Sequence, residues 1–282
     1  MVTKSGSMGQ GGFAERLRAS AHARESWLCV GLDPDPTRLP ASVERSGRGI
    51  TRFCQAIIDA TADVACAYKA NFAFFELMGA DGWRALEETR AHVPPDIPII
   101  ADAKRGDIGN TARAYADAIL TKLGFDAVTV NPYLGWDSLE PFFGYEGKGV
   151  FVLCKTSNPG ADDLQALVVD GEPLYMRVAR QAISLRVPAD IGLVVGATQP
   201  AALRAVRAID RETILLVPGV GAQGADAAEA ISYAANDSGD NALITVSREI
   251  LFASRDDNYV EAGSAVARRR ARETWHASSR TS

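Results

Sequence analysis

The apolar residues of this chain gather in short runs that end in polar or glycine-containing sequence, and longer segments with helical spacing lie between them. Such a run predicts a buried strand, and the longer segments predict helices. We expect strands at Trp27–Asp33, Cys66–Phe72, Pro98–Lys104, Ala127–Tyr133, Val150–Ser157, Gly192–Thr198, Leu215–Gly221 and Leu243–Arg248. The helical segments between them include Gly49–Thr61, Gly82–Ala91, Thr111–Leu123, Leu174–Arg186, Pro200–Ile209 and Ala225–Ala235.

Strand and helix alternate throughout, which is typical of α/β proteins with parallel sheets. Eight such units in about 250 residues fit a closed (β/α)₈ barrel, the TIM barrel, better than an open doubly wound sheet, which commonly has five or six strands. We therefore predict a single barrel domain over residues 13–265. A disordered segment is expected at 1–12 and a charged tail at 266–282, and we expect neither end to carry the fold.

Composition and charge narrow the functional classes. The chain has 282 residues, 47% hydrophobic and 23% charged, with a net charge of -5, which argues against a broad nucleic-acid-binding surface. No apolar run approaches the roughly 18 residues that span a bilayer, and the start of the chain lacks the apolar core of a signal peptide. We expect a cytoplasmic protein that binds neither nucleic acid nor a membrane.

The cysteines and histidines do not form a recognisable metal or catalytic motif. The four cysteines show no CxxC pair, and the three histidines lie far apart in the sequence. We therefore expect no zinc site and no histidine-based triad, and we interpret the cysteines as reduced core residues. They are Cys29, Cys54, Cys66 and Cys154.

Polar side chains recur where the predicted strands end. They are Asp33, Lys69, Asp102, Lys104, Asn131, Ser157, Gln223 and Arg248. In a (β/α)₈ barrel the C-terminal ends of the strands form the active site, so these residues are candidates for chemistry. Because alternate residues of a strand face the same side, Asp102 and Lys104 are expected to lie together. An ordinary ion-pair network at the barrel rim is the structural alternative.

Six segments together indicate a family. They are GLDPDP at 31–36, YKANFAFFE at 68–76, DAKRGDI at 102–108, TSNPG at 156–160, VPGVGAQGAD at 217–226 and VSREI at 246–250. In this order and spacing they resemble the orotidine 5'-phosphate decarboxylases, most of all the bacterial branch with a DAKRGDIG motif. The resemblance covers nearly the whole barrel. It implies decarboxylation of orotidine 5'-monophosphate to UMP, the last step of de novo pyrimidine synthesis, without a metal or organic cofactor.

The resemblance also implies catalytic roles for Lys69, Asp102, Lys104 and Asp107. Loss of CO₂ from carbon 6 leaves a poorly delocalised carbanion, so the site must stabilise negative charge and supply a proton. Lys104, flanked by Asp102 and Asp107, is expected to stay protonated and to donate that proton. Asp102 would lie beside the substrate carboxylate. Its repulsion of that carboxylate and a preorganised Lys–Asp array remain two open accounts of the rate enhancement.

Binding roles follow from the same motifs. Asp33 and Lys69 are expected to hold the ribose hydroxyls, and Pro218 to line the base pocket. Ser157 is expected to contact the amide edge of the pyrimidine, although Thr156 and Asn158 are close alternatives. How the long acidic connection 156–173 closes over the ligand is left open.

The phosphate is expected at the last two strands, where barrels often bind it. Gln223 can donate to it, Arg248 supplies a bidentate cation, and nearby glycines permit close approach of the backbone. We interpret the other arginines of this half, Arg204, Arg207, Arg211 and Arg255, as solvated charges.

The family resemblance further implies a homodimer in which Asp107 and Thr111 reach the neighbouring subunit's site. Two other functions remain alternatives. One is a nucleotide-binding barrel without turnover, which the presence of all four charged motif residues disfavours. The other is a sugar-phosphate decarboxylase or aldol-type lyase of the same barrel superfamily, which would need Mg²⁺.

Overall fold

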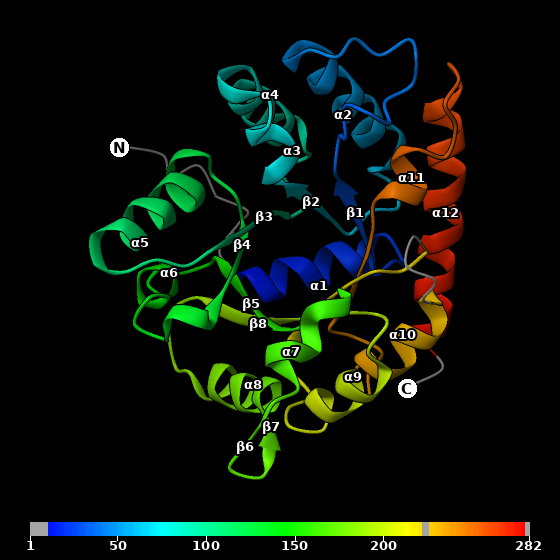
Figure 1. Ribbon diagram of the computed structural model, residues 1–282. Helices are drawn as coiled ribbons and strands as arrows, with labels where there is room; N and C mark the ends of the chain where they lie inside the picture. The colour runs from blue at the N-terminus through cyan, green and yellow to red at the C-terminus, as the bar shows by residue number, and fades with distance from the viewer. Residues whose placement is uncertain (1–10, 222–225, 280–282) are drawn as a thin grey trace, which may run out of the picture.

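The computed structural model describes residues 11–221 and 226–279, and its centre is a closed barrel of parallel strands (Figure 1). The order around the barrel is β1-β10-β9-β8-β5-β4-β3-β2. The strands are β1 (Leu28–Leu32), β2 (Ala67–Asn71), β3 (Ile99–Arg105), β4 (Ala127–Val130), β5 (Gly149–Lys155), β8 (Asp190–Val195), β9 (Ile214–Pro218) and β10 (Ala242–Val246). The predicted (β/α)₈ barrel is confirmed.

Each predicted strand coincides with one barrel strand, with ends that differ by at most three residues. The barrel closes where β1 pairs with β10, with Leu28 opposite Ile244. Strands such as β1, β4 and β10 are buried along their whole length. They read as continuous apolar runs because helices cover one face and the barrel core covers the other.

The predicted helices are present, with small differences at their ends. They are α2 (Gly47–Thr61), α4 (Gly79–His92), α5 (Gly109–Ala116), α8 (Leu174–Ser184), α9 (Pro200–Arg207) and α10 (Ala227–Ala234). The predicted helix at 111–123 is α5 followed by a π-helical segment, η1 (Asp117–Lys122). The start of the predicted helix at 225 lies outside the described residues.

Several short elements near the strand ends were not expected from the sequence. They are α3 (Phe72–Glu76), η2 (Pro132–Leu134), α6 (Glu140–Phe143), η3 (Pro159–Ala161), α7 (Asp162–Gln165), the hairpin of β6 (Val168–Val169) and β7 (Glu172–Pro173), and α11 (Arg248–Leu251). One turn of helix or two residues of strand is too short to establish a period in the sequence. Three of them, η3, α7 and the hairpin, lie in the 156–173 connection.

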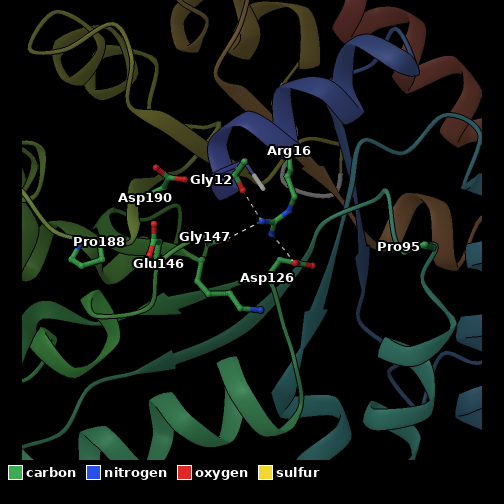
Figure 2. Close-up of a pocket in the computed structure, with 10 residues that line it drawn as sticks. Gly12, Arg16, Pro95, Asp126, Glu146, Gly147, Pro188 and Asp190 are labelled. Atoms are coloured by element: carbon green, nitrogen blue, oxygen red, sulfur yellow. Dashed lines mark hydrogen bonds and ion pairs between the residues drawn. The ribbon is translucent and has the colours of Figure 1, made fainter. Parts of the chain in front are cut away.

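Helix α1 (Phe13–Ala23) closes the N-terminal end of the barrel. Figure 2 shows Arg16 directed toward Gly147 and Asp126, and its guanidinium donates to both, at 3.0 Å and 2.8 Å. Asp190 accepts a hydrogen bond from Ala14 N at 2.8 Å. Because Asp126, Gly147 and Asp190 lie at the N-terminal ends of β4, β5 and β8, these contacts fix α1 across the bottom of the barrel.

The residues predicted to form a charged tail are instead part of the packed fold up to residue 279. Helix α12 runs from Tyr259 to Ser278 and lies beside α2 and α10 (Figure 1). Ala267 and Ala271 are buried, and the hydroxyl of Thr274 accepts a hydrogen bond from Trp27 N at 3.2 Å. The expected domain boundary at 265 is wrong. The arginine-rich sequence also contains alanines four residues apart, and these form one buried face of the helix.

The cysteines lie in the core as predicted, and all four are free and buried. Burial raises the pKa of Cys29, Cys54 and Cys154 to about 12, because it disfavours the thiolate. They are therefore packing residues rather than nucleophiles. No helix in the described part of the chain is long and apolar enough to cross a membrane.

One arginine that was interpreted as solvated is buried. The guanidinium of Arg207 donates to the carbonyls of Ala234, Asn241 and Thr213, and burial lowers its pKa to about 10. Arg207 therefore satisfies backbone acceptors around the ends of β9, β10 and α10. By contrast Arg204, Arg211 and Arg255 are exposed, as expected.

Candidate active site

Five of the predicted site residues surround one cavity at the C-terminal ends of the strands. The cavity has a volume of about 240 Å³. Its lining consists of Lys69, Asp102, Lys104, Thr129, Leu153, Thr156, Ser157, Asn158, Val194, Leu216 and Pro218. The structure thus brings Lys69, Asp102, Lys104, Ser157 and Pro218 together, and it keeps Thr156 and Asn158 beside Ser157.

A carboxylate held between two ammonium groups dominates this cavity. Asp102 Oδ2 accepts a hydrogen bond from Lys69 Nζ at 2.7 Å, and its Oδ1 accepts one from Lys104 Nζ at 2.5 Å. The side chains of Lys69 and Asp102 are 5% and 12% exposed, whereas that of Lys104 is 51% exposed. Two members of the array are therefore fixed in the barrel, and the third is accessible from the cavity.

The array fixes the charges of its buried members. Burial alone would raise the pKa of Asp102, but the neighbouring Lys69 and Lys104 hold it well below its usual range. Burial alone would lower the pKa of Lys69, but Asp102 and Asp33 keep it above its usual value. At neutral pH the site therefore contains an ionised carboxylate and a buried ammonium group.

Strand β3 departs from regular strand geometry near its C-terminal end, at Lys104. The register between β3 and β4 shifts between Ala101 and Arg105, and Lys104 has a positive φ of 48°. The left-handed conformation costs a residue other than glycine about 1–2 kcal/mol. The hydroxyl of Thr129 accepts a hydrogen bond from Lys104 N at 3.0 Å and donates to Asp102 Oδ1 at 3.1 Å.

Thr129 was missed by the sequence analysis. It lies in the middle of the apolar strand sequence AVTV, where threonine is an ordinary strand residue. The only signal was that β4 neighbours the strand of the DAKRGD motif in the predicted barrel. Which side chain meets the motif depends on the register between the strands.

Asp33 lies just beyond β1, next to the array. Its Oδ1 is 4.0 Å from Lys69 Nζ. This oxygen is buried and accepts no hydrogen bond from the described residues. The ion pair with Lys69 is too long to be a hydrogen bond, and a buried acceptor without a hydrogen-bond donor is unfavourable, so Asp33 is suited to accept a hydrogen bond from a ligand hydroxyl.

The loop that carries Ser157 is held by the following helix. The side-chain oxygen of Gln165 on α7 accepts a hydrogen bond from Thr156 N at 2.8 Å, and its side-chain nitrogen donates one to the Thr156 hydroxyl at 2.9 Å. Lys155, which is buried at the end of β5, forms an ion pair with Asp162. These contacts fold the start of the 156–173 connection back onto the barrel mouth.

The two predicted phosphate ligands are not both seen. Gln223 lies outside the described residues. Arg248 does not line the cavity of the array; it is exposed and lines a separate cavity of about 580 Å³ with Gly221 and Arg270. Gly219 and Gly221 have positive φ values of 107° and 76°, a conformation that glycine adopts readily.

Asp107 and Thr111 are not part of the cavity of their own chain. Asp107 Oδ1 accepts a hydrogen bond from Ile108 N at 2.8 Å, and no ion pair in the described structure joins Asp107 to Lys104. Thr111 is exposed in the first turn of α5. Of the two carboxylates expected to flank Lys104, only Asp102 does so among the described residues of one chain.

Across the described residues, no group of three or more His, Cys, Asp or Glu side chains is arranged to hold a metal ion.

Comparison with known proteins agrees with this geometry. The model of the orotidine 5'-phosphate decarboxylase / HUMPS family matches residues 26–262. The orotidine 5'-phosphate decarboxylase of Herpetosiphon aurantiacus is 49% identical over 90% of this chain and 95% of its own length. That of Roseiflexus castenholzii is 50% identical over 91% of this chain and 94% of its own length.

A solved structure extends the likeness to three dimensions. The Leishmania donovani OMP decarboxylase superposes with a TM-score of 0.81 at 40% identity, over 94% of this chain and 99% of that chain. The matches to the family model, to the two sequence relatives and to the solved structure all include the barrel that holds the Lys69–Asp102–Lys104 array. The chain therefore belongs to the orotidine 5'-phosphate decarboxylase / HUMPS family.

Proposed function

We propose that this chain decarboxylates orotidine 5'-monophosphate to UMP and CO₂, the last step of de novo pyrimidine synthesis, with the Lys69–Asp102–Lys104 array as its chemical centre. One observation carries the proposal. An ionised, buried carboxylate lies between two ammonium groups at the barrel mouth, and one of these ammonium groups is accessible from the cavity. Such an array is preorganised to stabilise a carbanion.

Lys104 is the proton donor in this mechanism. As the bond from carbon 6 to the carboxyl group breaks, its electron pair stays on carbon 6, and the ammonium group of Lys104 stabilises that charge. The same group then transfers a proton to carbon 6. The ammonium of Lys104 is suited to both steps because it is half exposed to the cavity and held by Asp102.

Asp102 orients Lys104 and lies beside the departing carboxylate. Its depressed pKa keeps it ionised, so its repulsion of the substrate carboxylate disappears when CO₂ leaves. Lys69 neutralises the far oxygen of Asp102 and therefore limits the cost of burying that charge. No organic cofactor and no metal ion enters this scheme.

The remaining residues bind the parts of the nucleotide that do not react. Asp33 and Lys69 hold ribose hydroxyls, Ser157 contacts the amide edge of the pyrimidine, and Pro218 lines the base pocket. Gln223 and Arg248 bind the phosphate. The shared cavity supports the roles of Ser157 and Pro218, and the Asp33 oxygen that accepts no hydrogen bond supports the role of Asp33.

The functional unit is a homodimer with shared active sites, in which Asp107 and Thr111 enter the partner's cavity. Two observations support this arrangement. Neither residue reaches the cavity of its own chain, and the two adjoining loops expose Ile108, Tyr133 and Leu134 at 64%, 77% and 53%. These loops lie against each other, because Asn131 N donates to Arg105 O at 2.8 Å. An apolar surface of this kind fits a second copy of the chain.

We also place the enzyme in the cytoplasm. Its four cysteines are free thiols, as is usual in a reducing compartment.

The test is a turnover assay with the purified full chain. Incubation with orotidine 5'-monophosphate should consume its absorbance and produce UMP, and the rate should be unchanged in excess EDTA. Absence of turnover would refute the proposed reaction. Activity that is lost in EDTA and regained with Mg²⁺ would instead favour the metal-dependent lyase chemistry of related barrels.

A further inference from the structure

The hydroxyl of Thr129 makes two hydrogen bonds, and both lead to catalytic groups. Thr129 lies on β4 and is 1% exposed, yet it borders the cavity of the array. Its oxygen accepts from Lys104 N at 3.0 Å and its proton is directed to Asp102 Oδ1 at 3.1 Å. The accepted hydrogen bond leaves the hydroxyl proton free for the carboxylate, so one side chain connects both residues.

The first of these contacts replaces a hydrogen bond of the sheet. Between Ala101 and Arg105 the β3–β4 register shifts, so this segment of β3 bulges away from the regular ladder. Lys104 takes up the left-handed conformation in this bulge. The Thr129 hydroxyl accepts a hydrogen bond from Lys104 N in place of a regular β-ladder partner. It thereby stabilises a left-handed backbone conformation that is unfavourable for lysine.

The second contact fixes the carboxylate. Asp102 Oδ1 receives both the Lys104 ammonium and the Thr129 hydroxyl, while Oδ2 receives Lys69. The two lysine side chains are long and have many rotamers, whereas threonine is restricted at χ1 by its branched Cβ. Thr129 is therefore the most rigid of the three donors that orient Asp102.

We infer that Thr129 is a positioning residue of the decarboxylation reaction, which sets the bulge at Lys104 and the orientation of Asp102 through a single hydroxyl. The inference rests on the proposed roles of these two residues. It predicts that loss of the hydroxyl affects the chemical step more than substrate binding. The phosphate and the ribose are bound by other strands.

The test compares Thr129→Val, which has nearly the same shape without the hydroxyl, with Thr129→Ser, which keeps the hydroxyl. Thr129→Val should lower kcat about 10- to 100-fold, because it removes a hydrogen bond to a charged carboxylate and leaves the Lys104 N–H without an acceptor, and should change KM less than about threefold. Thr129→Ser should retain kcat within about threefold, because the serine hydroxyl can make both hydrogen bonds. Thr89→Val is the matched control, because Thr89 is equally buried but lies on α4, away from the array.

Three results would overturn the inference: wild-type kcat in Thr129→Val, an equal loss in Thr129→Ser, or a loss of UMP affinity in Thr129→Val as large as its loss of kcat. If Thr129→Val does not fold, Thr129→Ser against Thr129→Ala supplies the same comparison. Lys104→Ala is measured in parallel. If Lys104→Ala is inactive and Thr129→Val is normal, only this inference fails; if Lys104→Ala is active, the proposed mechanism itself fails.

Discussion

At the scale of single residues, the site separates chemistry from binding. Lys104 and Asp102 form the proposed reactive pair, and the residues proposed to hold ribose, base and phosphate come mostly from other strands and loops. A substitution in the reactive pair should therefore reduce turnover without abolishing nucleotide binding. A substitution at the proposed phosphate site should lower kcat/KM by weakening substrate binding.

Lys104→Ala tests the reactive pair. It removes the proposed proton donor and the cation nearest the developing carbanion, so we expect kcat to fall by at least about three orders of magnitude. UMP should still bind in a calorimetric titration, and the circular dichroism spectrum should stay that of the folded barrel. Lys122→Ala, at an exposed lysine remote from the site, is the control. Near-normal turnover in Lys104→Ala would require another donor, and Lys69 is the nearby candidate.

Arg248→Ala tests the proposed phosphate contact. An arginine–phosphate interaction contributes about 1.5–3 kcal/mol, so kcat/KM should fall about 10- to 100-fold. The pH dependence of kcat should not change, because the phosphate is remote from carbon 6. Arg255→Ala, which alters an exposed arginine of the neighbouring loop, should have no effect. An unchanged kcat/KM in Arg248→Ala would exclude Arg248 from the binding site.

At the scale of elements, the helices at the two ends of the chain complete the barrel. Helix α1 closes its N-terminal end through Arg16 and Asp190, and α12 packs against α2 and α10. Neither helix contributes a residue to the cavity of the array. Their contribution is therefore to the stability of the barrel that positions the array.

Paired substitutions in α12 test this contribution. Ala267 is fully buried, whereas Ala265 in the same helix is exposed. Ala267→Asp places an unpaired charge in the packed face and should lower the free energy of unfolding by at least about 3 kcal/mol. Ala265→Asp should change it by less than about 0.5 kcal/mol, as is usual for surface positions. Urea unfolding gives both free energies. If Ala267→Asp unfolds with the same free energy as Ala265→Asp and the wild type, the packed face of α12 does not stabilise the fold.

At the scale of the whole molecule, the decisive question is whether one chain forms a complete site. Asp107 forms no hydrogen bond or ion pair with Lys104 among the described residues, and it belongs to a loop beside exposed Ile108 and Tyr133. A two-fold dimer would complete each site with Asp107 of the other subunit.

Mixing two inactive variants tests this arrangement. Lys104→Ala and Asp107→Ala chains each lack one half of the shared site, and a mixed dimer has one intact site and one doubly substituted site. After random exchange about half of the dimers are mixed, so about a quarter of the wild-type activity should return. Subunit exchange is confirmed with a size-tagged chain. If exchange occurs and no activity returns, each chain uses its own Asp107.

The sequence by itself determined the barrel strands, the main helices between them and the charged motif at the strand ends. Each strand of the barrel was visible as an apolar run, because burial on both faces requires apolar residues at successive positions. Lys69, Asp102 and Lys104 were found because charges at the ends of such runs are unusual, and their meeting in one cavity follows from parallel strands that end at one rim.

Tertiary structure decided what depends on contacts between distant segments. The register of β3 against β4 placed Thr129 beside Lys104, and no period within either strand specifies that register. The burial of Arg207 and of the α12 alanines depends on the elements that cover them, so charge-rich sequence was interpreted as exposed. The periodicity of the sequence indicates which face of a helix or strand is apolar. Only the packed molecule determines which element covers that face and which buried polar groups find a hydrogen-bond partner.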